Sequence, residues 1–105
     1  MIYLQDKDGR LVRLTGERLG HLESDHPEML GQIARIEETL REPERVIRSR
    51  ADAQVELHYR LYASTPVTRK YLCVVVKSLS KEEAFVVTAY FTNSPKRGDI
   101  LWATE

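Results

Sequence analysis

The chain has 105 residues, of which 42% are hydrophobic and 30% charged, as is typical of one soluble globular domain. Sixteen basic side chains balance sixteen acidic ones, so nucleic-acid binding would need a local basic surface rather than net charge. The single cysteine, Cys73, excludes a disulfide within the chain and fits a reducing cytoplasm, where we expect the protein to act. No apolar run approaches membrane-spanning length and residues 1–5 lead directly into polar sequence, so we expect neither membrane segment nor signal peptide.

The first part of the chain predicts a hairpin followed by two helices. Residues 1–5 and 10–15 are β-prone and flank an Asp-Gly turn. A first helix is predicted over residues 15–25, with a capping Thr or Gly at its start. A second helix is predicted from Pro27 to about Arg41, because apolar side chains recur there at helical spacing.

After the helices the apolar period becomes that of strands. The expected strands are residues 45–50, 55–62, 69–77 and 84–92, with a short last segment at 99–102. Helices followed by a run of strands are typical of an α+β fold with an antiparallel sheet. We therefore predict a single domain, residues 1–105, in which an N-terminal hairpin precedes two helices packed on a four-stranded antiparallel sheet. The sheet face away from the helices would be free to carry chemistry.

Two of the three histidines, His21 and His26, lie around the predicted break between the helices. Histidine titrates nearest to neutral pH, so a close pair suggests acid/base chemistry. Pro27 suits the first turn of a helix and would put His26 near its positive end, where the imidazolium is disfavoured. A helix boundary alone also accounts for His26 and Pro27, and the sequence leaves both interpretations open.

Metal binding is weakly supported. His21 and His26 are five residues apart rather than four, so they would not share one helical face. No cysteine pair is present, and we expect no metal and no cofactor. The third histidine, His58, falls on the more polar side of its strand, and we expect it to be solvated. Nothing near Cys73 in sequence would lower its pKa, so a catalytic thiol is not expected.

The predicted sheet presents cations and hydroxyls on one surface. Thr88 and Tyr90 share one side of the last long strand, and antiparallel pairing would bring Lys77 near Thr88. Arg48 and Arg50 add charge on the first strand of the sheet. Such a set can hold a phosphodiester, although Thr and Tyr are also good strand formers in general. The same alternation predicts that the core side of this strand consists of Phe85, Val87, Ala89 and Phe91.

Taken in order, several segments resemble a family of small nucleases. The matching residues are His21, His26-Pro27, Pro43 before the strand with Arg48, Tyr59–Tyr62, Val74–Lys77 and Phe85–Tyr90. The family is the phage-type branch of the superfamily that includes barnase, EndoU, colicin D and RelE-like proteins. The resemblance covers roughly residues 18–92, and the order of two helices and a four-stranded antiparallel sheet is also that of the superfamily.

The resemblance implies metal-independent RNA cleavage, in which the 2′-hydroxyl attacks the adjacent phosphorus and leaves a 2′,3′-cyclic phosphate. This reaction needs a base, an acid and a cation that stabilises the charge building on phosphorus. By resemblance, His21 or His26 would be the base or the acid, and Lys77 would stabilise the transition state. Thr88 and Tyr90 would position the phosphate or relay a proton.

Further expectations concern substrate and partners. Arg48 and Arg50 would contact phosphates of an RNA substrate. If the chain is a toxin-like nuclease, an inhibitory protein partner is also expected, whereas the oligomeric state stays open. The alternative is a catalytically inactive module of the same fold that binds protein or nucleic acid.

Overall fold

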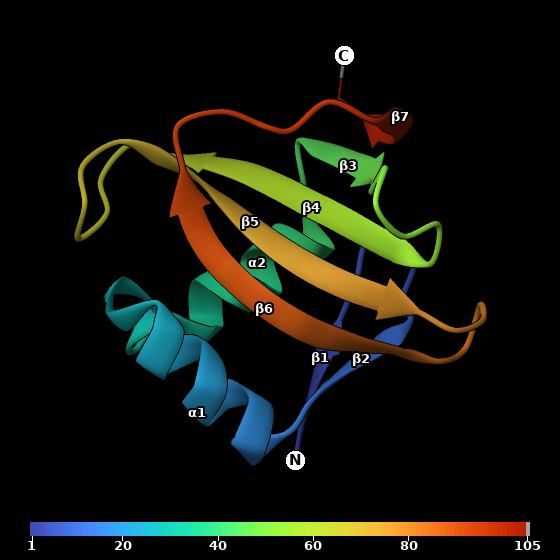
Figure 1. The fold of residues 1–105 in the computed structure, drawn as a ribbon, viewed down its shortest axis with the longest axis horizontal. Coiled ribbons are helices and arrows are strands. Elements are labelled where there is room, and N and C mark those ends of the chain that lie inside the picture. The colour runs from blue at the N-terminus through green and yellow to red at the C-terminus, as the bar shows by residue number, and fades with distance from the viewer. Residues whose placement is uncertain (105) are drawn as a thin grey trace.

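In the computed structural model, residues 1–104 are described, so the last residue of the predicted domain lies outside them. The described residues form one curved sheet with helices on one face (Figure 1). The strands are β1 (Ile2–Gln5), β2 (Leu11–Leu14), β3 (Arg45–Arg48), β4 (Val55–Tyr62), β5 (Lys70–Ser78), β6 (Ala84–Thr92) and β7 (Asp99–Ala103). The helical elements are α1 (Gly16–Asp25), the 3-10 helix η1 (Pro27–Met29) and α2 (Ile33–Arg41). Within residues 1–104 no helix is long and apolar enough to cross a bilayer.

The prediction of a four-stranded antiparallel sheet is wrong. Within residues 1–104 the sheet has seven strands in the order β1-β2-β6-β5-β4-β3-β7, and it is mixed. The N-terminal hairpin extends the sheet through β2, which pairs in parallel with the start of β6, Val12 lying opposite Ala84. At the other edge β7 pairs antiparallel with β3. Both additions give partners to backbone groups that edge strands would otherwise leave unpaired.

The first helix agrees with its prediction, whereas the second starts later than expected. The hydroxyl of Thr15 accepts a hydrogen bond from the backbone N–H of Arg18 (3.0 Å) and caps α1, which ends at Asp25. The helix predicted from Pro27 is instead interrupted after three residues. Gly31 adopts a left-handed φ of 76°, which ends the η1 turn, so that α2 begins only at Ile33.

The main hydrophobic core lies between the helices and the sheet. Leu22 of α1, Met29 of η1 and Leu40 of α2 are all fully buried there. They pack with buried residues of the strands, namely Leu4, Val12, Leu14, Leu72, Val74, Val76, Ala84, Val86 and Ala89. Figure 1 shows α1 beside β6 and α2 across the sheet, so the helices shield one face.

A β-bulge in β6 changes the side to which its residues point. Val75 of β5 is opposite Thr88, but the next residue, Val76, is opposite Val86, so β6 contains one extra residue. The predicted core side of this strand is therefore only half right. Ala89 belongs to the core as expected, whereas before the bulge the buried residues are Ala84 and Val86 rather than Phe85 and Val87.

A second, smaller core lies on the sheet face opposite to the helices. It consists of the buried residues Ile47, Leu57, Tyr59 and Cys73. Residues 93–98, which connect β6 to β7 across the strand ends in Figure 1, contact this core. The backbone N–H of Lys96 donates to the Tyr59 hydroxyl (3.0 Å), and the backbone of Gly98 packs against Ile47. This face of the sheet is thus partly covered and not wholly free.

Candidate functional site

His26 and Tyr90, two predicted site residues, lie next to each other. Their ring centroids are 5.6 Å apart and the ring planes are tilted by 34°. His26 connects α1 to η1, while Tyr90 lies near the end of β6, where β6 forms the sheet edge because β2 pairs only with Ala84 and Phe85. His26 Nδ1 is 3.7 Å from a carboxylate oxygen of Glu28, and its side chain is 35% exposed. An imidazole at a sheet edge, partly open to solvent, can exchange protons with a bound molecule.

Thr88 shares the face of Tyr90. The two residues are opposite Val75 and Cys73 of β5, whose side chains pack into the second core on the sheet face away from the helices. Thr88 and Tyr90 are both half-buried. Burial raises the pKa of Tyr90 above its ordinary value, and the neighbouring Cys73 adds to this effect. The phenol is therefore a hydrogen-bond donor at neutral pH.

Lys77 of β5 lies on the same face of the sheet as Thr88 and Tyr90, but its ammonium is bound to another residue. Its ammonium forms an ion pair with Asp52 (2.6 Å), and the hydrogen bond from Lys77 lowers the pKa of this carboxyl. Lys77 is four residues along β5 from Cys73, the partner of Tyr90, which corresponds to ~13 Å of strand. The fold thus separates Lys77 from the pair of His26 and Tyr90.

The remaining predicted residues are also dispersed. His21 is on α1 with a side chain that is 63% exposed, and its recorded partner is Glu17 (3.7 Å). Arg48 ends β3 and Arg50 follows it, both exposed. Because β5 and β4 lie between β6 and β3, roughly 14 Å of sheet separates β3 from the strand of Tyr90. Of the seven predicted site residues, the structure brings His26 next to Tyr90, and Thr88 lies two residues before Tyr90 on the same strand face.

Sequence reasoning missed the contribution of Lys96. Tyr90, Tyr59 and the positive charge of Lys96 each act to lower the pKa of the Cys73 thiol. Burial nevertheless dominates and raises the pKa of Cys73 to about 11, so the thiol stays protonated at neutral pH. Lys96 is exposed and lies in the loop that follows Tyr90. The adjacent basic residues Lys96 and Arg97, so soon after that strand, were the available signal.

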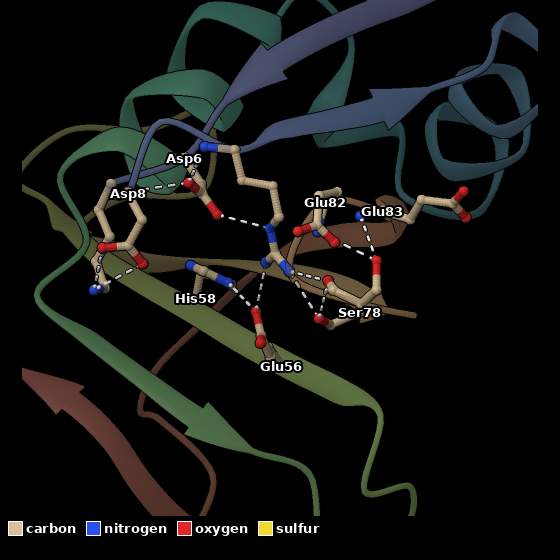
Figure 2. Close-up of polar contacts among 10 residues, drawn as sticks. Asp6, Asp8, Glu56, His58, Ser78, Glu82 and Glu83 are labelled. Atoms are coloured by element: carbon tan, nitrogen blue, oxygen red, sulfur yellow. Dashed lines mark hydrogen bonds and ion pairs between the residues drawn. The ribbon is translucent and has the colours of Figure 1, made fainter.

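A second polar cluster includes Asp6, Glu56 and Ser78 (Figure 2), which all bind the guanidinium of Arg10. The guanidinium donates hydrogen bonds to the carboxylates of Asp6 (3.0 Å) and Glu56 (3.1 Å) and to the hydroxyl of Ser78 (2.7 Å). The Asp6 carboxylate also accepts hydrogen bonds from the backbone N–H groups of Asp8 and Arg10. These contacts join the turn of the N-terminal hairpin to β4 and β5. The cluster is a link between chain segments distant in sequence, and the sequence did not predict it.

His58 belongs to this cluster, and the expectation that it is solvated is wrong. Its side chain is only 3% exposed, and its Nε2 lies 3.2 Å from a carboxylate oxygen of Glu56. His58 does fall on the predicted side of β4, but the hairpin turn lies over that side, and the edge strand β7 contributes Trp102 to the space beside it. Together these elements enclose a pocket of about 740 Å³, lined among others by His58 and Trp102. Alternation along a strand cannot reveal what covers each face.

Metal ligation finds no support in the positions of the side chains. Among residues 1–104 no three His, Cys, Asp or Glu side chains are grouped so that they could hold a metal ion. Comparison of the chain with protein-family models, with curated proteins and with solved structures gives no match. The resemblance to small nucleases therefore stays a prediction.

Proposed function

We propose that the chain is a ribonuclease-like protein that cleaves RNA without a metal ion, with His26 at its reactive centre. The observation that carries the proposal is the contact between the His26 and Tyr90 rings, whose centroids are 5.6 Å apart. The two residues are far apart in sequence and belong to different layers of the fold. The sequence alone predicts both as site residues.

The chemistry follows from the side chains around this pair. In the proposed reaction His26 takes the proton of the attacking 2′-hydroxyl while water protonates the leaving 5′-oxygen, or His26 protonates the leaving 5′-oxygen while water takes the proton of the 2′-hydroxyl. Tyr90, whose pKa is raised by burial, donates a hydrogen bond to a phosphate oxygen. Thr88 adds a hydroxyl on the same face. The products are a 2′,3′-cyclic phosphate and a free 5′-hydroxyl.

The cation of the proposed site is Lys96 rather than Lys77. Lys96 is exposed, and its charge acts on Cys73, which lies opposite Tyr90 in the sheet. Lys77 is engaged with Asp52. An exposed ammonium in the loop that follows the strand of Tyr90 can neutralise charge that builds on a bound phosphate. Lys96 thus replaces Lys77 as the cation that stabilises the transition state, and the proposed reaction is unchanged.

The proposal is tested with purified chain and mixed-sequence RNA in the presence of a chelator, with the 2′,3′-cyclic ends quantified over time. His26→Ala should lower the cleavage rate by roughly 10²–10⁴-fold, the usual contribution of an acid/base group. His21→Ala is the matched control, because that histidine is exposed and lies 3.7 Å from Glu17, and the rate of this variant should stay within about 3-fold of wild type. Lys96→Ala should be slower than Lys77→Ala.

Two results would contradict the proposal. One is the absence of cleavage by folded chain at high protein concentration, and the other is an equal loss of rate in His26→Ala and His21→Ala. Binding of RNA or of a protein in the absence of cleavage would favour the catalytically inactive alternative. If the chain is a toxin-like nuclease, its inhibitory protein partner should reduce cleavage by covering His26 and Tyr90.

A further inference from the structure

The pocket beside the Arg10 cluster is distinct from the surface around His26. It lies between the hairpin turn, the start of β2, strands β3, β4 and β7, and the turn after β5. Its volume of about 740 Å³ falls within the range of small-molecule sites. Trp102 and Leu101 contribute apolar wall, while carboxylate and cationic side chains surround the rest. The proposed RNA chemistry makes no use of this pocket.

One buried atom in the pocket wall has no hydrogen-bond partner. His58 Nδ1 is inaccessible to solvent and makes no hydrogen bond within residues 1–104. Figure 2 shows the His58 ring between Glu56 and the hairpin turn, with one ring nitrogen directed at Glu56 and the other toward the side of Asp8. Unsatisfied buried polar atoms are rare in folded proteins because they lose their hydrogen bonds to water. This one points to a missing partner.

The protonation of His58 follows from Glu56. The hydrogen bond with His58 Nε2 (3.2 Å) and the guanidinium of Arg10 lower the pKa of Glu56, so the carboxyl is ionised and only accepts hydrogen bonds. Nε2 of His58 must then carry the proton that is donated to Glu56. A second proton on Nδ1 would bury an N–H group without an acceptor, which is costly. Nδ1 is therefore a lone-pair acceptor, and its partner has to be a donor.

The charges around the pocket also favour a ligand that donates hydrogen bonds. Of the described residues that line it, four are carboxylates and three are cationic, so an anion would meet a net negative wall. Glu82 at the rim is exposed, and among residues 1–104 no ion pair to its carboxylate is found. The aromatic wall already attracts a cation, since the Lys7 ammonium lies 5.1 Å from the Trp102 ring centroid.

We propose that this pocket binds a small organic cation, namely an amidine, guanidine or primary amine carried on a flat or apolar body. One N–H of the ligand donates to His58 Nδ1 and, because this atom is inaccessible to solvent, the side chains that cover it move aside on binding. The apolar body lies against Trp102, where it competes with the Lys7 ammonium. Remaining N–H groups face the rim carboxylates, with Glu82 as the available acceptor. The site is independent of the ribonuclease proposal and stands or falls separately.

Three probes of the same shape and different charge test the proposal: benzamidine (cation), benzamide (neutral) and benzoate (anion). Trp102 is the only tryptophan in the chain, so its fluorescence reports on the pocket directly. Benzamidine should bind at least about tenfold more tightly than benzoate, with benzamide in between, and at millimolar or better affinity, as expected for a fragment of this size. In ¹⁵N spectra of the imidazoles, benzamidine should shift His58 Nδ1 and leave His21 unchanged.

Variants separate the pocket from unspecific binding. His58→Leu should weaken benzamidine at least about tenfold, and His21→Leu should have no effect. If His58→Leu does not fold, Trp102→Leu serves the same purpose. Binding to this variant is then followed by the His58 resonance instead of tryptophan fluorescence, and the substitution should also weaken benzamidine binding. The proposal is overturned if benzoate binds more tightly than benzamidine. It is equally overturned if neither Trp102 nor His58 responds to about 20 mM benzamidine, well above the expected affinity.

Discussion

Replacing Arg10 with methionine should destabilise the fold by about 3 kcal/mol at pH 7. The Arg10 side chain is 12% exposed and provides counter-ion and donors to Asp6 and Glu56, of which the former is 4% exposed. Methionine keeps an apolar stem of similar length but leaves both carboxylates without this partner. Breaking a buried ion pair from one side costs about 3–5 kcal/mol, and the 23% exposure of Glu56 places the value at the lower end. Total stabilities of only about 5–15 kcal/mol make this a large effect.

Urea unfolding followed by circular dichroism measures the effect, with Arg13→Met as the matched control. Arg13 is a half-buried arginine of β2, and no hydrogen bond or ion pair of its side chain is found among residues 1–104. Its substitution should cost about 0.5 kcal/mol or less. In thermal unfolding Arg10→Met should lower the Tm by at least about 10 °C, at roughly 4–8 °C per kcal/mol for a chain of this size.

The pH dependence provides a second, independent test. Because the pKa of Glu56 is lowered from its ordinary value of 4.5, the stabilisation from this carboxylate is complete above that pH and is lost as the pH falls through the lower, folded-state value. In Arg10→Met the unpaired carboxylates can take up protons at low pH, which relieves the cost of burying them. The difference in stability between wild type and Arg10→Met should therefore shrink between pH 7 and about pH 4. A difference no larger than that of Arg13→Met, or one that does not change with pH, would refute the reasoning.

Two further predictions concern the sheet face away from the helices. Gly98→Ala should destabilise the fold by about 1–3 kcal/mol in urea unfolding, because a Cβ there would approach the Arg48 carbonyl oxygen and lie 2.6 Å from Ile47 Cγ2. Gly20→Ala in α1 is its control and should stabilise by up to about 1 kcal/mol, since nothing lies within 4 Å of the added Cβ; equal effects would contradict the packing argument. Cys73, with a pKa of about 11, should react slowly with a disulfide reagent at pH 8 until urea unfolds the chain. Rapid reaction of the folded chain would show that the thiol is accessible and ionised.

Local features of the sequence predicted the longest strands and the first helix. The bounds of β4 and β6 agree with residues 55–62 and 84–92, and the end of α1 agrees with the predicted break before Pro27. Alternation, capping and proline act over a few neighbouring residues, so the sequence is enough to place them. The prediction of the second helix was wrong for a local reason as well. A single glycine, Gly31, adopts a left-handed conformation that other residues avoid, and this interrupts the predicted helix.

The pattern of apolar and polar residues could not predict which strands pair with each other. Strands β1, β2 and β7 have four or five residues each, and nothing in so short a segment identifies the strand that it pairs with. The hairpin therefore seemed separate from the sheet, although β2 pairs in parallel with β6. The sequence did not predict the bulge near Thr88 for a similar reason. Alternation assumes that every residue of a strand has a partner, so it does not reveal an inserted residue.

By itself, the sequence determined which side chains are able to titrate, donate or carry charge, and it selected His26, Thr88 and Tyr90 among them. Only the tertiary structure decided which of these meet. It joined the His26 ring to Tyr90, held Lys77 against Asp52, and buried His58 beneath a hairpin turn some fifty residues earlier in the chain. The physical reason is that chemical character belongs to each residue, whereas proximity and burial arise from the packing of segments far apart in sequence, which periodicity along one segment does not encode.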